Sequence, residues 1–72
     1  MRFQKEENTK IRFEQDGIYI MNSKYQTKDK ITDLKKEGKT FYNAIHSEEI
    51  DNLIDVEKFI KKKFIIPLNS YE

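Results

Sequence analysis

The sequence predicts one small α+β domain over residues 1–72, with the element order β-β-α-β-α. Alternating apolar and polar residues on both sides of Asp16-Gly17 predict a β-hairpin. An aromatic-rich segment after Gly38 predicts a further strand. Apolar residues recur at helical spacing between Ser47 and Phe64. We expect this last segment to be a long C-terminal helix packed on one face of a small antiparallel sheet.

Composition restricts the function classes. The 14 basic and 13 acidic residues leave a net charge of +1, so nucleic-acid or anionic-lipid binding would need a local patch. Without cysteine and with one histidine, neither a disulfide nor an ordinary zinc site can stabilise the domain. Docking onto another protein or onto a second copy is the remaining device, and a self-sufficient monomer is the alternative. With no signal peptide and no long apolar run, we expect a cytoplasmic protein.

The hairpin is preceded by Met1 to Asn8, a loose arm or a short strand if Phe3 reaches the core. A two-residue loop at Asp16-Gly17 would pair Phe13 with Ile20. One face then holds Ile11, Phe13, Ile18 and Ile20, and the other holds Arg12, Glu14, Tyr19 and Met21. We expect the first face to be the core face.

The segment Lys28 to Glu37 has two interpretations. Ile31 and Leu34 lie three residues apart among good helix formers, and Gly38 suits the position after a helix. The alternative is a second hairpin turning at Glu37-Gly38. The helix is favoured because the hairpin would point Ile31 and Leu34 to opposite faces.

Lys39 to His46 is the expected strand that leads into the long helix. Ser47 is the expected N-cap, with acidic residues in the first turn and lysines in the last. The apolar stripe comprises Ile50, Leu53, Val56, Ile60 and Phe64. Pro67 ends the helical pattern, so we expect Phe64–Leu68 to fold back as an edge strand, followed by a frayed tail over Asn69–Glu72.

Catalytic and metal-binding patterns are weak. No phosphate-binding glycine loop is present, and adjacent His46 and Ser47 are better explained as a strand end and an N-cap. Glu48, Asp51 and Asp55 would share one side of a helix, where they would either hold a cation or complement the helix N-terminus. We expect no catalytic residue, no metal, no cofactor and no small-molecule substrate, hence no enzyme.

Two sets of residues are candidates for binding. Large apolar residues around the long helix would contact a partner, unless the C-terminal run covers them: Ile54, Phe59, Phe64 and Ile66. The hairpin face and the helix lysines would contact single-stranded nucleic acid: Arg12, Tyr19, Lys58, Lys61 and Lys62.

The junction FYNAIHSEEIDNLI, residues 41–54, resembles the single-stranded-DNA-binding transcriptional coactivators, in which strands precede a C-terminal helix. The basic strand loops of that family are not evident here, so the resemblance transfers no site residue. We expect a non-catalytic protein-binding regulator or inhibitor, of the anti-defence type that phages and mobile elements encode. The alternative is a single-stranded nucleic-acid-binding module.

Overall fold

The computed structural model describes residues 1–68 and shows an α+β fold with five strands in two antiparallel sheets. The larger sheet has the order β2 (Thr9–Glu14), β3 (Gly17–Asn22), β4 (Thr27–Ile31), and the smaller sheet pairs β1 (Phe3–Lys5) with β5 (Ile65–Pro67). The helices are α1 (Glu37–Ile45), the 3₁₀ helix η1 (Leu53–Val56) and α2 (Glu57–Lys61). The α+β class is confirmed, but the predicted β-β-α-β-α order with one long C-terminal helix is wrong.

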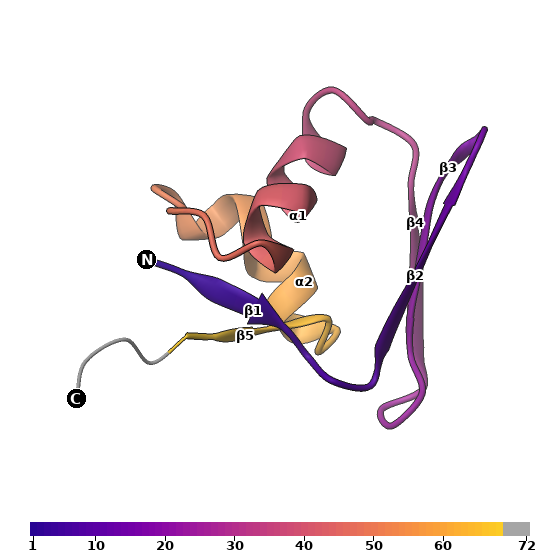
Figure 1. The fold of residues 1–72 in the computed structure, drawn as a ribbon, viewed down its shortest axis with the longest axis horizontal. Helices are drawn as coiled ribbons and strands as arrows, with labels where there is room; N and C mark the ends of the chain where they lie inside the picture. Colours follow the sequence, from indigo (N-terminus) through magenta and orange to yellow (C-terminus); the bar gives the residue numbers. More distant parts are fainter. Residues whose placement is uncertain (69–72) are drawn as a thin grey trace.

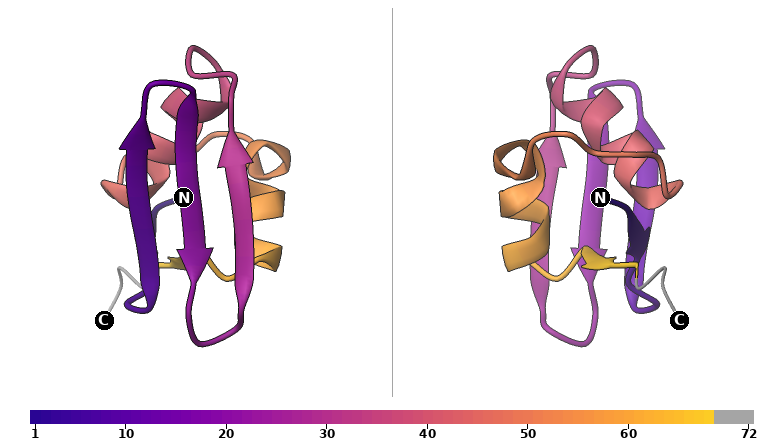
Figure 2. Two further views of the ribbon diagram at one scale, coloured as in Figure 1. Left: turned by 90° about the vertical axis from the view of Figure 1, so that its right-hand side faces the viewer. Right: turned by 90° about the vertical axis from the view of Figure 1, so that its left-hand side faces the viewer.

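The larger sheet has one covered face and one open face. Figure 1 shows this sheet edge-on, with both α-helices and the β1–β5 pair on the same side. In the left view of Figure 2 the three strands of the sheet lie in front, with the rest of the fold behind them. We call the covered side the inner face and the open side the outer face.

The hairpin is present, with a register two residues away from the predicted one. Its loop is Gln15-Asp16, so Phe13 pairs with Ile18 instead of Ile20. A shift of two residues keeps each side chain on its face, because strand side chains alternate with a period of two. Gly17 belongs to β3, with φ of +151°, and a Cβ there would lie 2.6 Å from the Ile31 carbonyl oxygen. Close approach of β4, and not a type I′ loop, therefore requires this glycine.

The inner face is buried only over its centre. Ile18 and Ile20 lie in the core, but Phe13, on the edge strand beside the hairpin loop, is 65% exposed. The prediction that Phe13 belongs to the core is therefore wrong. Its side chain points to the inner face but extends beyond the residues that cover it.

The predicted helix over Lys28–Glu37 is wrong, and so is its alternative, a hairpin turning at Glu37-Gly38. The chain forms β4 and then a turn, and the second hairpin turns at residues 23–26. Asp29 occupies an inner position, where its carboxylate lies 3.4 Å from Nζ of Lys58 on α2. A charged residue facing inward breaks the apolar alternation by which a strand is recognised.

The predicted strand over Lys39–His46 is helix α1. Its buried residues Gly38, Phe41 and Ala44 recur at intervals of three, as on one side of a helix. Gly38 lies in the first turn of α1 and not beyond a helix end. Aromatic content and the position after a glycine favoured a strand here, and packing of the helix against the sheet outweighs that preference.

The predicted N-cap Ser47 instead ends α1. It has φ of 61°, its N–H donates to the carbonyl of Ala44, and the N–H of Glu48 donates to the carbonyl of Asn43. These two hydrogen bonds define a Schellman motif. Because FYNAI is helical, residues 41–54 do not have the strand-to-helix arrangement on which the resemblance to the coactivators rested.

The predicted helix over Ser47–Phe64 is interrupted. Backbone hydrogen bonds join Ile50 to Met1 in both directions, at 2.8 and 3.0 Å, which holds this segment outside a helix. Helical structure begins only after Asn52, whose side chain accepts a hydrogen bond from the N–H of Ile54. The tertiary contact of the N-terminal segment therefore outweighs local helix propensity.

The core lies between the inner face and the other elements. It comprises Phe3, Ile18, Ile20, Ile31, Phe41, Ala44, Ile50, Val56, Phe59, Phe64 and Ile65. The rings of Phe41 and Phe59 meet edge to face, with centroids 4.9 Å apart. The expectations that Phe3 reaches the core in a strand and that the C-terminal run forms an edge strand are confirmed. The predicted tail over Asn69–Glu72 lies outside the described residues.

Neither α1 nor α2, nor any other helix within residues 1–68, combines the length and apolar character that crossing a bilayer requires.

Candidate functional site

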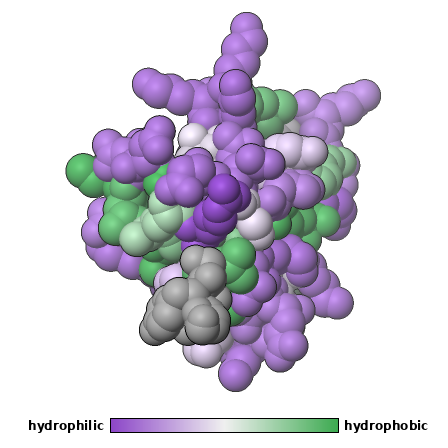
Figure 3. All heavy atoms as spheres, turned by 60° about the vertical axis from the view of Figure 1, so that its left-hand side comes forward, coloured by the Kyte–Doolittle hydropathy of each residue, from purple (hydrophilic) through white to green (hydrophobic). Residues whose placement is uncertain are grey.

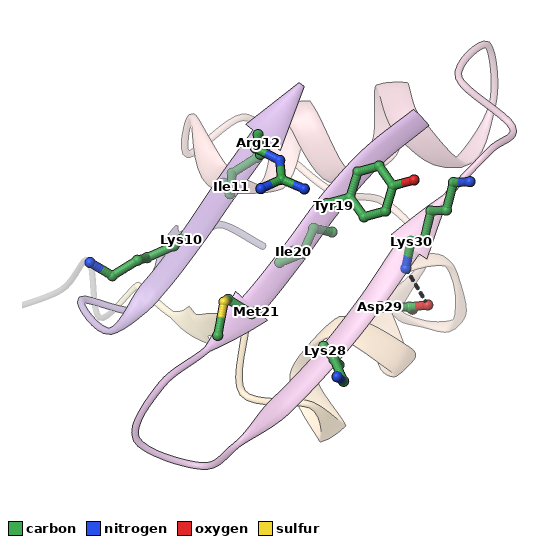
Figure 4. A pocket seen from close by; sticks show the side chains of 9 residues that line it. All are labelled: Lys10, Ile11, Arg12, Tyr19, Ile20, Met21, Lys28, Asp29 and Lys30. Carbon is green, nitrogen blue, oxygen red and sulfur yellow. Dashed lines mark hydrogen bonds between the residues drawn. The ribbon is translucent and has the colours of Figure 1, made fainter. Parts of the chain in front are cut away.

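The outer face carries two parallel rows of side chains, fixed by the strand register. Arg12 pairs with Tyr19, and Tyr19 pairs with Lys30. In the next row Met21 has Lys10 on one side and Lys28 on the other. Each row therefore consists of a cation, an apolar or aromatic residue and a second cation, with one residue from each strand. Figure 4 shows these six side chains across β2, β3 and β4.

Tyr19 lies between two cations. The guanidinium carbon of Arg12 is 5.3 Å from the ring centroid, and Nζ of Lys30 is 5.1 Å from it. Both distances are within the range of cation–π attraction. The ring is half-buried, so part of it remains available for contact.

Asp16, in the hairpin loop, binds two side chains of the Arg12–Tyr19–Lys30 row. Its carboxylate accepts hydrogen bonds from Nζ of Lys30 at 2.9 Å and from the hydroxyl of Tyr19 at 2.8 Å. The bonds from Lys30 and then Tyr19 lower the pKa of Asp16, and the bond to Asp16 raises the pKa of Lys30. Both groups are therefore charged at neutral pH.

The outer face is more basic than the chain as a whole. Lys10, Arg12, Lys28 and Lys30 provide four positive charges, and Glu14 is the single acid at the outer positions of β2–β4. The strand positions sum to +3, and the loop carboxylate of Asp16 reduces the face to +2, whereas the whole chain is +1, so the remaining residues sum to −1. Between these side chains lies a shallow hollow of about 660 Å³.

The residue types on this face could contact an anionic or flat ligand. Its cations are donors for phosphate or carboxylate oxygens, and Tyr19 and Met21 offer apolar surface for a flat group. Arg12 is already paired with Glu14, at 2.7 Å between Nε and Oε2, and this exposed pair is easily exchanged for another anion.

The predicted nucleic-acid residues separate into two groups. Arg12 and Tyr19 lie together on the outer face, but the lysines of α2 lie on the other side of the sheet (Figure 1). Lys58 forms ion pairs with Glu37 and Asp29, and these partners, Glu37 foremost, raise its pKa. Lys62 donates to the Lys28 carbonyl at 3.1 Å, and Lys61 lies 3.8 Å from Glu57. Lys58 and Lys62 thus fasten α2 to β4.

Sequence reasoning missed three cations of the outer face: Lys10, Lys28 and Lys30. Lys28 and Lys30 were assigned to a helix, which removed them from the sheet. In the structure the two lysines occupy the exposed positions between the inner residues of Thr27–Ile31, but inward-facing Asp29 hides this alternation in the sequence.

The predicted partner-binding residues also separate. Phe59 and Phe64 are 0% exposed and belong to the core, so neither is available at the surface in this conformation. Ile54 is 75% exposed and Ile66 is 36% exposed. Ile54 shares a shallow hollow of about 350 Å³ with residues of α2 and its C-cap: Glu57, Lys58, Lys61 and Lys62. On the helix side shown in Figure 3 the hydrophobic areas are separated by hydrophilic ones.

The candidate catalytic and metal residues do not converge. Glu48 and Asp51 precede the 3₁₀ helix that contains Asp55, so the three carboxylates do not share one helix face. Within residues 1–68 no group of three or more His, Cys, Asp or Glu side chains is placed to hold a metal ion. Nδ1 of His46 lies 2.8 Å from the carbonyl oxygen of Tyr42, within its own helix turn.

The fold and this face define a small α+β domain with an open, basic sheet surface. No protein-family model, curated protein or solved structure matches the chain.

Proposed function

We propose that this protein is a non-catalytic nucleic-acid-binding domain that holds a short single-stranded segment on the outer face. The observation that carries the proposal is the pair of rows, each with an apolar or aromatic centre between two cations. Single-strand binders combine cations that contact the backbone with side chains on which bases stack. The sequence offered two functions, nucleic-acid binding and protein binding. The residues for nucleic-acid binding on the outer face are exposed or half-buried, whereas two of the four predicted partner-binding residues lie in the core.

In the proposed complex Tyr19 stacks against one base and Met21 contacts its neighbour. Arg12 and Lys30 then bind phosphates beside the first base, and Lys10 and Lys28 bind phosphates beside the second. The two rows are about 7 Å apart, because alternate strand residues are separated by twice about 3.4 Å. Neighbouring bases in a duplex are about 3.4 Å apart and stacked on each other. The spacing therefore favours a single strand whose bases are spread apart.

Binding should be weak and moderately salt-dependent. With at most four phosphate contacts, the slope of log K against log salt should be no steeper than about −3 for a single strand.

The double variant Lys10→Gln, Arg12→Gln removes two of the proposed phosphate contacts. It should weaken binding of an oligothymidylate about 25-fold near 0.1 M salt, since each phosphate contact to a single strand contributes roughly fivefold there. Fluorescence anisotropy at two salt concentrations measures both quantities.

The matched control is Lys35→Gln, Lys61→Gln, which removes the same charge from exposed sites off the outer face. It should retain nearly all of the affinity. Tyr19→Leu should weaken binding about fivefold or more through lost stacking, whereas Tyr19→Phe should not. Equal losses for the two double variants, or wild-type binding by Tyr19→Leu, would contradict the proposal.

Asp16 competes with the proposed ligand for Lys30, which gives a variant expected to bind more tightly. Asp16→Asn should raise affinity about two- to fivefold, the range expected for releasing one exposed ion pair. The lowered pKa of Asp16 means that wild-type protein keeps this competition throughout the neutral range. The same titration at pH 6 and pH 8 should therefore give the same ratio between variant and wild type. Unchanged or reduced affinity would show that Lys30 does not contact the ligand.

A second candidate is the protein-binding regulator or inhibitor, and the exposed Ile54 beside the lysines of α2 favours it. An acidic partner with an apolar anchor would fit this hollow. Ile54→Asp should then abolish a specific complex while leaving oligonucleotide binding unchanged. The two functions are separable, because the hollow beside Ile54 and the hollow of the outer face have no lining residue in common.

A further inference from the structure

Strand β2 forms an open edge of the larger sheet. The sheet order places β3 on one side of β2, and the described chain provides no strand on the other. Natural edge strands are usually protected by proline, by a bulge or by an inward-facing charge. β2 has none of these, because its pairing with β3 is unbroken and its inner positions are Thr9, Ile11 and Phe13.

The hydrogen-bond pattern shows which backbone groups face the open edge. In a hairpin with a two-residue loop the closing pair, Glu14 and Gly17, is hydrogen-bonded, and alternate residues follow. The even-numbered residues of β2 therefore bond to β3, as does Asn8, whose carbonyl accepts from the N–H of Ser23. The odd-numbered residues face outward.

The outward-facing N–H and C=O groups of Thr9 are hydrogen-bonded within the same chain. Its N–H donates to the carbonyl of Glu6 at 2.9 Å, and its carbonyl accepts from Nζ of Lys5 at 2.9 Å. The N–H and C=O groups of Ile11 and Phe13 have no such partner among residues 1–68. The edge therefore presents two donors and two acceptors in a row, beside the exposed ring of Phe13.

We infer that a second copy of this chain pairs antiparallel with β2 and makes a six-stranded sheet across a twofold axis at Arg12. In this register Ile11 of each copy lies opposite Phe13 of the other, so the free backbone groups of both residues are hydrogen-bonded in both copies. On the outer face Lys10 of each copy lies opposite Glu14 of the other, which gives two pairs of opposite charge. Opposite charges directly across a strand pair are stabilising.

Other registers fit less well. Centring the axis on Ile11 would place Lys10 opposite Arg12 twice and would need the outward groups of Thr9, which are already bonded. Centring it on Phe13 would pair Ile11 with the loop residue Gln15. The chosen register has one like-charged contact, between the two Arg12 side chains, and each of these is already paired with the Glu14 of its own chain.

Sedimentation velocity from about 10 μM to 1 mM tests the association. Wild type should show a reversible dimer, and Phe13→Lys should shift the dissociation constant at least tenfold toward monomer. Because Phe13 is exposed, its replacement should leave the fold intact, which circular dichroism checks. Met21→Lys is the matched control, since Met21 is also exposed but lies on the central strand, and it should still dimerise.

Disulfide trapping tests the register. Because the chain has no native cysteine, an introduced cysteine can form a disulfide only with its counterpart in the second copy. Arg12→Cys would place one thiol from each copy at the axis, as a non-hydrogen-bonded pair with Cα atoms about 4.5 Å apart, within disulfide range. This variant should therefore cross-link fully under mild oxidation. Lys10→Cys should not, because the two copies of that position would be about 14 Å apart. A monomer at 1 mM, a dimer indifferent to Phe13→Lys, or cross-linking at position 10 but not 12 would each overturn the inference.

Discussion

Phe59→Ala should lower the free energy of unfolding by about 3–5 kcal/mol, the usual cost of truncating a fully buried phenylalanine. The ring of Phe59 is 0% exposed and packs edge to face on Phe41. A domain of this size has only about 5–15 kcal/mol of stability in total, so the variant should be close to unfolded. Urea unfolding followed by circular dichroism measures the change, with the thermal midpoint as a second observable.

Ile54→Ala is the control for this experiment. It removes an apolar side chain from the neighbouring helical segment, but Ile54 is 75% exposed and should change stability by less than about 0.5 kcal/mol. The comparison also tests the earlier hypothesis that Phe59 is a docking residue. A Phe59→Ala protein of normal stability that had lost an association would support that hypothesis against the structure.

Asn22→Leu should cost about 2–4 kcal/mol, since several buried hydrogen bonds of about 1 kcal/mol each are lost without a change in overall size. The side chain of Asn22 is fully buried. Its Nδ2 donates to Oε1 of Glu6 and to the carbonyl of Lys63, both at 2.8 Å, and lies 3.3 Å from Oγ1 of Thr9. Its Oδ1 accepts from the N–H groups of Lys24 and Tyr25. One amide thus connects three separate turns.

Asn22→Asp separates hydrogen bonding from packing, because it keeps the shape and replaces the donor by an acceptor. The new carboxylate would face Glu6, whose pKa is raised by desolvation but lowered overall by hydrogen bonds from Asn8 and Asn22. The pKa of the new group should therefore be raised in the folded state. Its penalty is absent below the unfolded pKa of about 3.9 and grows as pH rises above it. Unfolding at pH 4 and pH 7 should show the larger loss at pH 7.

Asn43→Ala is the matched control for both Asn22 variants. Asn43 lies half-buried on α1 and its side chain makes no hydrogen bond within residues 1–68. Alanine is the better helix former, so this variant should be neutral or slightly stabilised. Equal losses at positions 22 and 43 would show that the amide network does not carry the stability assigned to it.

Local patterns predicted the first hairpin and the two faces of its strands, because turn chemistry and alternation agree there. They failed where a residue serves a distant partner. Asp29 faces inward to meet Lys58, which concealed β4. Ile50 bonds to Met1, which prevents a helix that its sequence favours. Both effects arise between residues far apart in the chain, and periodicity within a short window cannot report them.

The helix ends show a second limit of pattern reading. Both α-helices end with a residue in the left-handed region, Ser47 and Lys63, where glycine is the expected residue. For α2 the N–H of Phe64 donates to the carbonyl of Phe59, as in α1. Without glycine, neither helix end carries its usual sequence signal, which is why Ser47 resembles the start of a helix in the sequence.

The candidate site was recoverable in part. Arg12 and Tyr19 followed from the alternation within the hairpin, and the structure places them side by side. Lys10, Lys28 and Lys30 could not be added until β4 was known to be a strand. Lys58, Lys61 and Lys62 were chosen for their density in sequence, but two of them are used to hold α2 against β4.

The pairing of β1 with β5 bears on how the chain folds. Strands β2, β3 and β4 are joined by short turns, so the larger sheet can form from contacts of low sequence separation. β1 and β5 pair residue 3 with residue 67, which closes a loop of nearly the whole chain and carries the largest closure entropy. We therefore expect the three-stranded meander to form early in folding, and the pairing of β1 with β5 to form late.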